Sequence, residues 1–136
     1  MLLKQTSDVN PADWFDTAAD RLAIADLAWK YEGFTPTGIE CLHEAAERYL
    51  KGYLIANGWV LQRTHDLGLL TRAAIGFNLQ FNGFVPTATE LTEKFFEQHY
   101  PGGDLTELAK NYETLRAKVG EMIELIKTLL PQYFPK

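Results

Sequence analysis

The sequence has one cysteine, Cys41, among its 136 residues, so it cannot form a disulfide within the chain. It also has no run of eighteen or more apolar residues, which excludes a transmembrane helix of ordinary length. The first ten residues, MLLKQTSDVN, lack the basic region and the long apolar stretch of a secretory signal peptide. From these absences we expect a cytoplasmic protein without membrane-spanning segments.

Basic residues are also few, because 13 Lys and Arg stand against 18 Asp and Glu and give a net charge of -5. Binding to the backbone of duplex DNA usually depends on a basic surplus, so duplex DNA is not an expected partner. The chain contains no Gly-x-Ser-x-Gly elbow, no glycine-rich phosphate loop and no Cys-x-x-Cys pair. Their absence weighs against a hydrolase, a kinase or a zinc module.

What the sequence does have is helical periodicity. Apolar residues recur every three or four positions through most of the chain, and no segment shows the alternation typical of a strand. Helices are expected at about 11–32, 36–57, 65–80, 87–99 and 104–130. The connections are short, so we predict one all-α domain over residues 1–136, an antiparallel up-and-down bundle of four to five helices.

Capping residues precede most of these segments. Asn10 before Pro11 offers an N-cap followed by proline at the first helical position. Three pairs have the spacing of a capping box: Thr37 with Glu40, Thr87 with Glu90, and Asp104 with Glu107. Helix ends are expected at Gly33, Asn57-Gly58, Asn82-Gly83 and Pro101-Gly102-Gly103.

The last expected helix carries the longest apolar stripe. Its members are Leu105, Leu108, Tyr112, Leu115, Val119, Met122, Ile126 and Leu129. The stripe is expected to lie across the core of the bundle, and part of it could continue into a dimer partner. The two roles are compatible, and both stay open.

One pair of residues has the spacing of a metal site. Glu40 and His43 match the Glu-x-x-His pattern of di-iron bundles. Such a site needs a second pair, yet neither His65 nor His99 has a glutamate three positions before it. We therefore expect no metal and no cofactor.

The same helix carries two acidic residues with a basic residue four positions later. These pairs are Glu44 with Arg48 and Glu47 with Lys51. Pairs at this spacing face each other on a helix and contribute about 0.2–0.5 kcal/mol each. They predict a solvated face.

The segment Arg63-Thr64-His65-Asp66 opens the third expected helix. Thr64 is expected to cap this helix, with Asp66 in its first turn near the positive end of the helix dipole. A helix start requires neither Arg63 nor His65. A histidine in this position is held toward its neutral form and can act as a hydrogen-bond acceptor or a base. A structural role and a functional role for His65 both stay open.

Several motifs occur in a defined order along the chain. They are Trp14-Phe15 with Ala18 and Leu22, Ala45-Ala46-Glu47-Arg48 with Lys51, Thr64-His65-Asp66-Leu67, and Tyr100-Pro101. In this order they resemble the HEPN domain (higher eukaryotes and prokaryotes nucleotide-binding domain). The resemblance covers nearly the whole chain and implies an antiparallel bundle of four or five helices.

The resemblance also implies a choice of activities. Many HEPN domains are metal-independent ribonucleases, active as dimers, whose mark is an arginine followed four to six residues later by a histidine. No arginine of this chain has a histidine at that spacing. The arginines are Arg21, Arg48, Arg63, Arg72 and Arg116. Other members are thought to bind nucleotides or to act beside a nucleotidyltransferase on a separate chain.

These considerations lead to one main prediction. The chain is expected to be a homodimeric, non-catalytic binding module for a nucleotide or for a nucleotidyltransferase or toxin–antitoxin partner. Its expected ligand-binding residues, which would form a small cationic pocket for a phosphate, are Arg48, Lys51, Arg63, His65, Asp66 and Tyr100.

Two alternatives stay open. In the first, the chain is a divergent ribonuclease in which His65 or His99 acts as the general base toward a ribose 2′-hydroxyl. In the second, it is a structural antitoxin or scaffold subunit that uses the last helix as its interface.

Overall fold

The computed structural model describes residues 5–97 and 102–135, and this part of the chain is helical without a strand. Its elements are α1 (Pro11–Glu32), α2 (Pro36–Ala56), α3 (Leu67–Ile75), the 3-10 helix η1 (Leu79–Phe84), α4 (Val85–Glu97), α5 (Thr106–Leu129) and the 3-10 turn η2 (Pro131–Tyr133). The all-α fold expected from the sequence is confirmed. None of the described helices is long and apolar enough to cross a membrane.

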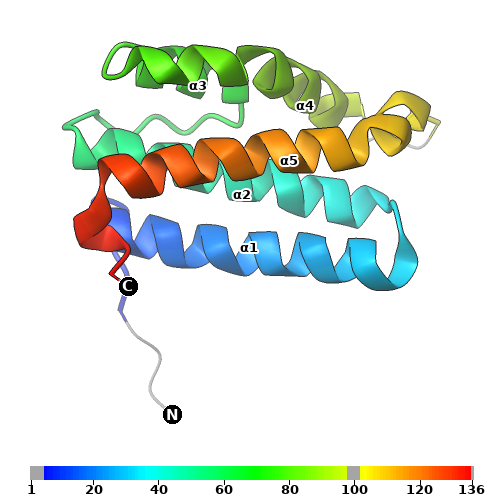
Figure 1. Ribbon diagram of the computed structural model, residues 1–136, viewed down its shortest axis with the longest axis horizontal. Helices are drawn as coiled ribbons and strands as arrows, with labels where there is room; N and C mark the ends of the chain where they lie inside the picture. Colours follow the sequence, from blue (N-terminus) through cyan, green and yellow to red (C-terminus); the bar gives the residue numbers. More distant parts are fainter. Residues whose placement is uncertain (1–4, 98–101, 136) are drawn as a thin grey trace.

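Helices α1 and α2 form an antiparallel pair along one side of the molecule, and α5 lies against α2 (Figure 1). Asn10 caps α1 and Gly33 ends it, as the sequence predicts. Gly33 has a φ of 75°, a conformation that favours glycine, and its N–H donates to the Trp29 carbonyl. The chain therefore reverses within three residues between the two helices.

The expected capping box at Thr37 is wrong, because α2 begins two residues earlier. The side chain of Thr35 accepts a hydrogen bond from the Gly38 N–H, and Pro36 occupies the first helical position. Proline is well suited to that position because its missing N–H would have no partner there. Thr37 consequently lies within the first turn.

The third and fourth helices differ most from the expectation. Helix α3 covers only Leu67–Ile75, and η1 leads directly into α4 at Val85, so Asn82-Gly83 is not a helix end. The Asn78 side chain caps η1 through the Gln80 N–H. Thr87 lies buried inside α4 and does not cap it. The physical reason is the burial of Phe81 and Phe84, which draws this turn into the core.

Helix α5 begins at Thr106, whose N–H donates to the Asp104 side chain, so the expected start is right within two residues. Its apolar stripe lies in the core, with these members buried: Leu108, Tyr112, Leu115, Val119, Met122 and Ile126. The buried part of the stripe is therefore not available to a partner.

Two contacts attach α1 to α5. The Trp29 ring stacks on the Tyr112 ring with centroids 4.6 Å apart. The Arg116 guanidinium binds both carboxylate oxygens of Asp26, at 2.7 and 3.0 Å. Because α2 is covered by α1 on one side and by α5 and α3 on others, it is the most buried helix of the bundle.

Helix α1 packs closely against α2 at Gly52. A Cβ atom added to Gly52 would lie 2.6 Å from Cε1 of Phe15. The Phe15 ring is held in place by Tyr133 and Phe134 at the end of the chain, at centroid distances of 5.6 and 4.8 Å. Glycine at this position is therefore required by packing.

We expect Gly52→Ala to destabilise the protein by about 1–3 kcal/mol, because the Phe15 ring has no room to withdraw. Urea unfolding followed by circular dichroism measures this loss. Gly83→Ala in η1 is the matched control, since its added Cβ would meet no atom within 4 Å. Equal stabilities of the two variants would contradict the close packing of α1 on α2.

Candidate ligand-binding site

The carboxylate of Glu47 lies at the centre of a buried polar cluster on α2. Its Oε2 atom lies 2.9 Å from Nζ of Lys51, one turn later on the same helix. Its Oε1 atom lies 2.9 Å from Nδ1 of His65, in the connection that precedes α3. Glu47 and Lys51 are only 6% and 4% exposed, so the expectation of a solvated face for this pair is wrong.

His43, one turn before Glu47, is the most buried member of the cluster at 1% exposure. Its Nδ1 atom lies 3.9 Å from Oε1 of Glu47. Burial lowers the pKa of the His43 imidazole to about 4, while the nearby Glu47 carboxylate opposes this shift and His65 adds to it. His43 is therefore neutral at physiological pH.

The connection between α2 and α3 brings His65 to this cluster. Asp66 caps α3 through the Leu69 N–H, and the Thr64 hydroxyl accepts a hydrogen bond from the Asp66 N–H. The cap is thus Asp66, and the expectation that Thr64 caps the helix is wrong. The Leu67 N–H donates to the Thr92 hydroxyl of α4, which fixes the start of α3.

A cavity of about 440 Å³, here called the central cavity, opens above this cluster. Its lining residues are Asp8, Trp14, Glu47, Arg48, Lys51, Leu61, Arg63 and His65. Three of them, Leu61, Arg63 and His65, alternate along the connection. This connection is not helical, and it presents all three side chains to the cavity.

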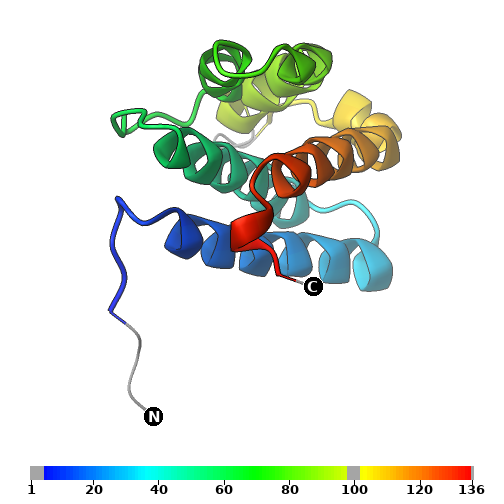
Figure 2. The same ribbon diagram turned by 60° about the vertical axis from the view of Figure 1, so that its left-hand side comes forward.

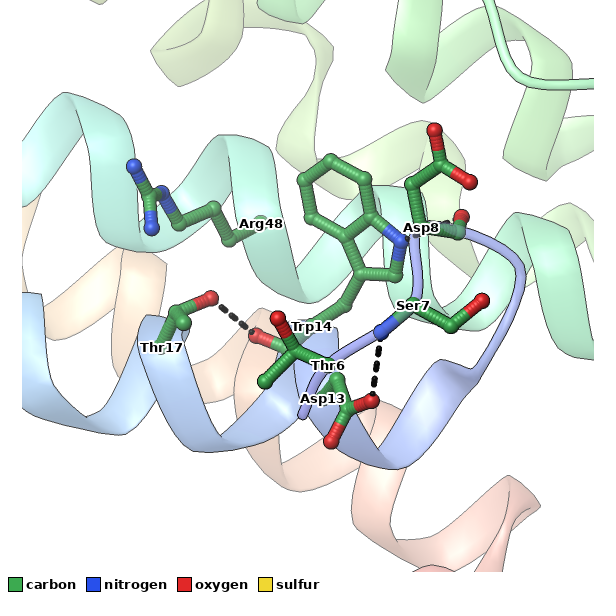
Figure 3. A pocket seen from close by; sticks show the side chains of 7 residues that line it. All are labelled: Thr6, Ser7, Asp8, Asp13, Trp14, Thr17 and Arg48. Atoms are coloured by element: carbon green, nitrogen blue, oxygen red, sulfur yellow. Dashed lines mark hydrogen bonds between the residues drawn. The ribbon is translucent and has the colours of Figure 1, made fainter. Parts of the chain in front are cut away.

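Trp14 forms the wall of the central cavity on the α1 side. The Nζ atom of Lys51 lies 5.5 Å from the centre of the indole, and the indole N–H donates to the Asp8 carbonyl at 2.9 Å. Figure 3 shows the indole between Asp8 and Arg48, in an adjoining hollow of about 250 Å³. The N-terminal segment is fixed there by the hydrogen bond from Ser7 N–H to the Asp13 carboxylate.

Arg63 differs from the other cations of the cavity. Its guanidinium makes no ion pair or hydrogen bond with any residue that the structure describes. Lys51 is paired with Glu47, and Arg48 lies 3.9 Å from Glu44. Among the described residues that line the cavity, Arg63 is therefore a cation that is available to an external anion.

The comparison with protein families agrees with this architecture. The model of the HEPN domain matches residues 11–130. The chain belongs to the HEPN domain family. No curated protein and no solved structure was found to match the chain.

Within this HEPN domain, the structure brings together four of the six residues expected to bind a ligand. Arg48, Lys51, Arg63 and His65 all line the central cavity. Asp66 caps α3 instead and does not line it. Tyr100 lies outside the described residues, as does His99.

Two features of the candidate site were missed by the sequence analysis. Glu47 and Asp8 place carboxylates beside the cations, so the site is not a simple cationic pocket. The indole of Trp14 supplies an aromatic wall. Helical spacing alone did not single out Trp14, because it places Trp14 on the same face as Ala18, which is buried.

The described residues contain no group of three or more side chains suited to hold a metal ion. Cys41 is buried, and burial raises the pKa of its thiol, with the Glu44 carboxylate adding to this effect. A thiol in such surroundings is a poor nucleophile.

His43 should make the stability of this HEPN domain dependent on pH. An unfolded histidine binds a proton near pH 6.5, but folded His43 binds one only near pH 4. Between these values the unfolded state binds more protons, so stability falls as the pH falls. The wild-type protein should lose unfolding free energy between pH 7 and pH 4.5. We expect His43→Gln to lose about 2 kcal/mol less than the wild type over the same range. Urea unfolding at both pH values measures it, and equal losses would contradict the low pKa.

Proposed function

We propose that this HEPN domain binds the phosphate group of a nucleotide in the central cavity. The observation that carries the proposal is the guanidinium of Arg63, which lines the cavity and has no partner among the described residues. An arginine in this state offers a phosphate two parallel N–H donors. The phosphate of a nucleotide would be the anion that binds Arg63.

The other charges of the cavity support this assignment. The charge of Lys51 is neutralised by one carboxylate oxygen of Glu47, and the other oxygen of Glu47 contacts His65. Arg48 is half-buried and lies at a weak distance of 3.9 Å from Glu44. Arg48 and Arg63 are therefore the two cations that can approach one phosphate, while Asp8 disfavours an anion near its own end of the cavity.

We expect Arg63→Ala to weaken nucleotide binding about 10-fold or more, because a charge-assisted hydrogen bond contributes roughly 1.5–3 kcal/mol. Isothermal titration with a panel of nucleoside mono- and triphosphates measures the loss. Arg72→Ala is the matched control, since Arg72 is an exposed arginine of α3 that does not line the cavity. Equal affinities of the two variants would contradict the proposal.

A second candidate function is cleavage of an RNA phosphodiester. It is favoured by the 2.9 Å contact between Nδ1 of His65 and Oε1 of Glu47. A buried carboxylate on one ring nitrogen orients an imidazole, so that its other nitrogen can face a substrate proton. In this function His65 would accept the proton of a ribose 2′-hydroxyl, and Arg63 would stabilise the charge on the phosphorus centre.

If His65 is a general base, His65→Gln should lower the rate of RNA cleavage by about 10²–10⁴-fold. Cleavage of a fluorescently labelled single-stranded RNA in the presence of a chelator measures this rate. Arg72→Ala controls for a contaminating nuclease and should leave the rate unchanged. Absence of cleavage by the wild-type protein would contradict this second function.

We also propose a homodimer and an association with a nucleotidyltransferase or toxin–antitoxin partner, on the basis of the family. The buried stripe of α5 cannot provide these interfaces. Exposed apolar side chains of α1 are better placed, namely Ile24, Leu27 and Tyr31, which are 38%, 55% and 73% exposed. Their spacing of three and four puts them on one face of that helix.

A further inference from the structure

A second hollow adjoins the central cavity at the far end of α2. It has a volume of about 570 Å³ and is lined mainly by apolar side chains. Those that define it, here called the apolar hollow, are Val9, Ile55, Trp59, Val60 and Leu61. Ile55 belongs to the last turn of α2, and Figure 2 shows the two segments that contribute the others, the approach to α1 and the connection after α2, at the same end of the α1–α2 pair.

The apolar hollow is fixed by the backbone at the end of α2. Gly58 has a φ of 88°, and the Trp59 N–H donates to the Leu54 carbonyl at 3.0 Å. Trp59 in turn packs against the hydrophobic core. Its walls are therefore in place before a ligand arrives, and a volume of this size lies within the range of ligand sites.

Two valines of this hollow have exposed side chains. Val9 and Val60 are 71% and 80% exposed, and they come from segments far apart in the sequence. Exposed apolar surface gathered around a concave site is the surface that a ligand covers.

The apolar hollow and the central cavity share one wall. Arg63, Leu61 and Asp8 line both. A ligand whose phosphate is held by Arg63 would therefore extend its neighbouring group into the apolar hollow.

We propose that the apolar hollow is the subsite for the base of a nucleoside phosphate whose phosphate is bound by Arg63. This rests on the proposed nucleotide-binding function. The base stacks against apolar walls, as bases do on aromatic and aliphatic side chains. The Asp8 carboxylate, which has no side-chain partner among the described residues, accepts a hydrogen bond from an amino group of the base.

Asp8 is the reason to assign a base rather than an alkyl or acyl chain. A purely apolar ligand would cover this carboxylate without giving it a hydrogen bond, which is unfavourable. Adenine carries both a flat apolar face and an exocyclic amino group, so it satisfies both parts of the hollow.

The test compares AMP with ribose 5-phosphate, which has the same sugar and phosphate but no base. Isothermal titration of the full chain should show AMP binding about tenfold more tightly than ribose 5-phosphate. Val60→Ser should reduce this ratio several-fold and leave the affinity for ribose 5-phosphate unchanged. Leu79→Ser is the matched control, because Leu79 is an aliphatic residue of similar exposure, 79%, that lines none of these hollows.

Three results would overturn the base subsite. One is equal binding of AMP and ribose 5-phosphate to the wild-type protein, and another is an AMP preference that Val60→Ser leaves intact. In both cases, loss of ribose 5-phosphate binding in Arg63→Ala would still support the phosphate site. The third is an absence of binding by either ligand, which would overturn the phosphate site together with the base subsite.

Discussion

A carboxylate buried in a helical bundle is costly unless it is paired, and the pairing of Glu47 organises this molecule. One oxygen binds Lys51 from the next turn of α2, and the other binds His65 from a segment eighteen residues further along the chain. Removing one partner of such a buried pair typically costs about 3–5 kcal/mol, because the remaining charge is left without compensation. The fully buried pair is Glu47 with Lys51, whereas the His65 side chain is 63% exposed, so the contact with His65 attaches the connection between α2 and α3 to this pair at its surface side.

This constraint also divides the positive charges of the site into two kinds. Lys51 is held against Glu47 and over the Trp14 ring, 5.5 Å from its centre, so its charge serves the folded structure. Arg63 lies two residues before His65 on the same connection, so it is brought to the cavity without a carboxylate of its own. The buried pair thus positions an arginine whose charge remains available. The site therefore combines a paired, stabilising charge at Lys51 with a charge at Arg63 that can bind an anion.

Helix positions were largely predictable from sequence because periodicity is a local property. The bounds of α1 and the buried stripe of α5 follow from the spacing of apolar residues and from Asn10 and Gly33. The segment around Phe81 was not predictable in this way. There, burial of two phenylalanines outweighs the helix-stop signal of Asn82-Gly83, and tertiary packing decided the outcome.

The site shows a different limit of sequence reasoning. The basic residues were identifiable, but the burial of Glu47 and Lys51 was not, since the same spacing occurs on solvated helix faces. Only the packing of α1 and of the connection over α2 distinguishes the two cases.

The conformation of the connection explains why Arg63 and His65 act together. On a helix, residues two positions apart point about 200° away from each other, so these two side chains would diverge. The chain is not helical until Leu67, because Asp66 caps α3 and Thr64 bonds to the Asp66 N–H. Leu61, Arg63 and His65 consequently face one cavity. The hydrogen bond that caps α3 at Asp66, and the bond from the Asp66 N–H to the Thr64 hydroxyl just before it, therefore keep this segment out of the helix and help to shape the site.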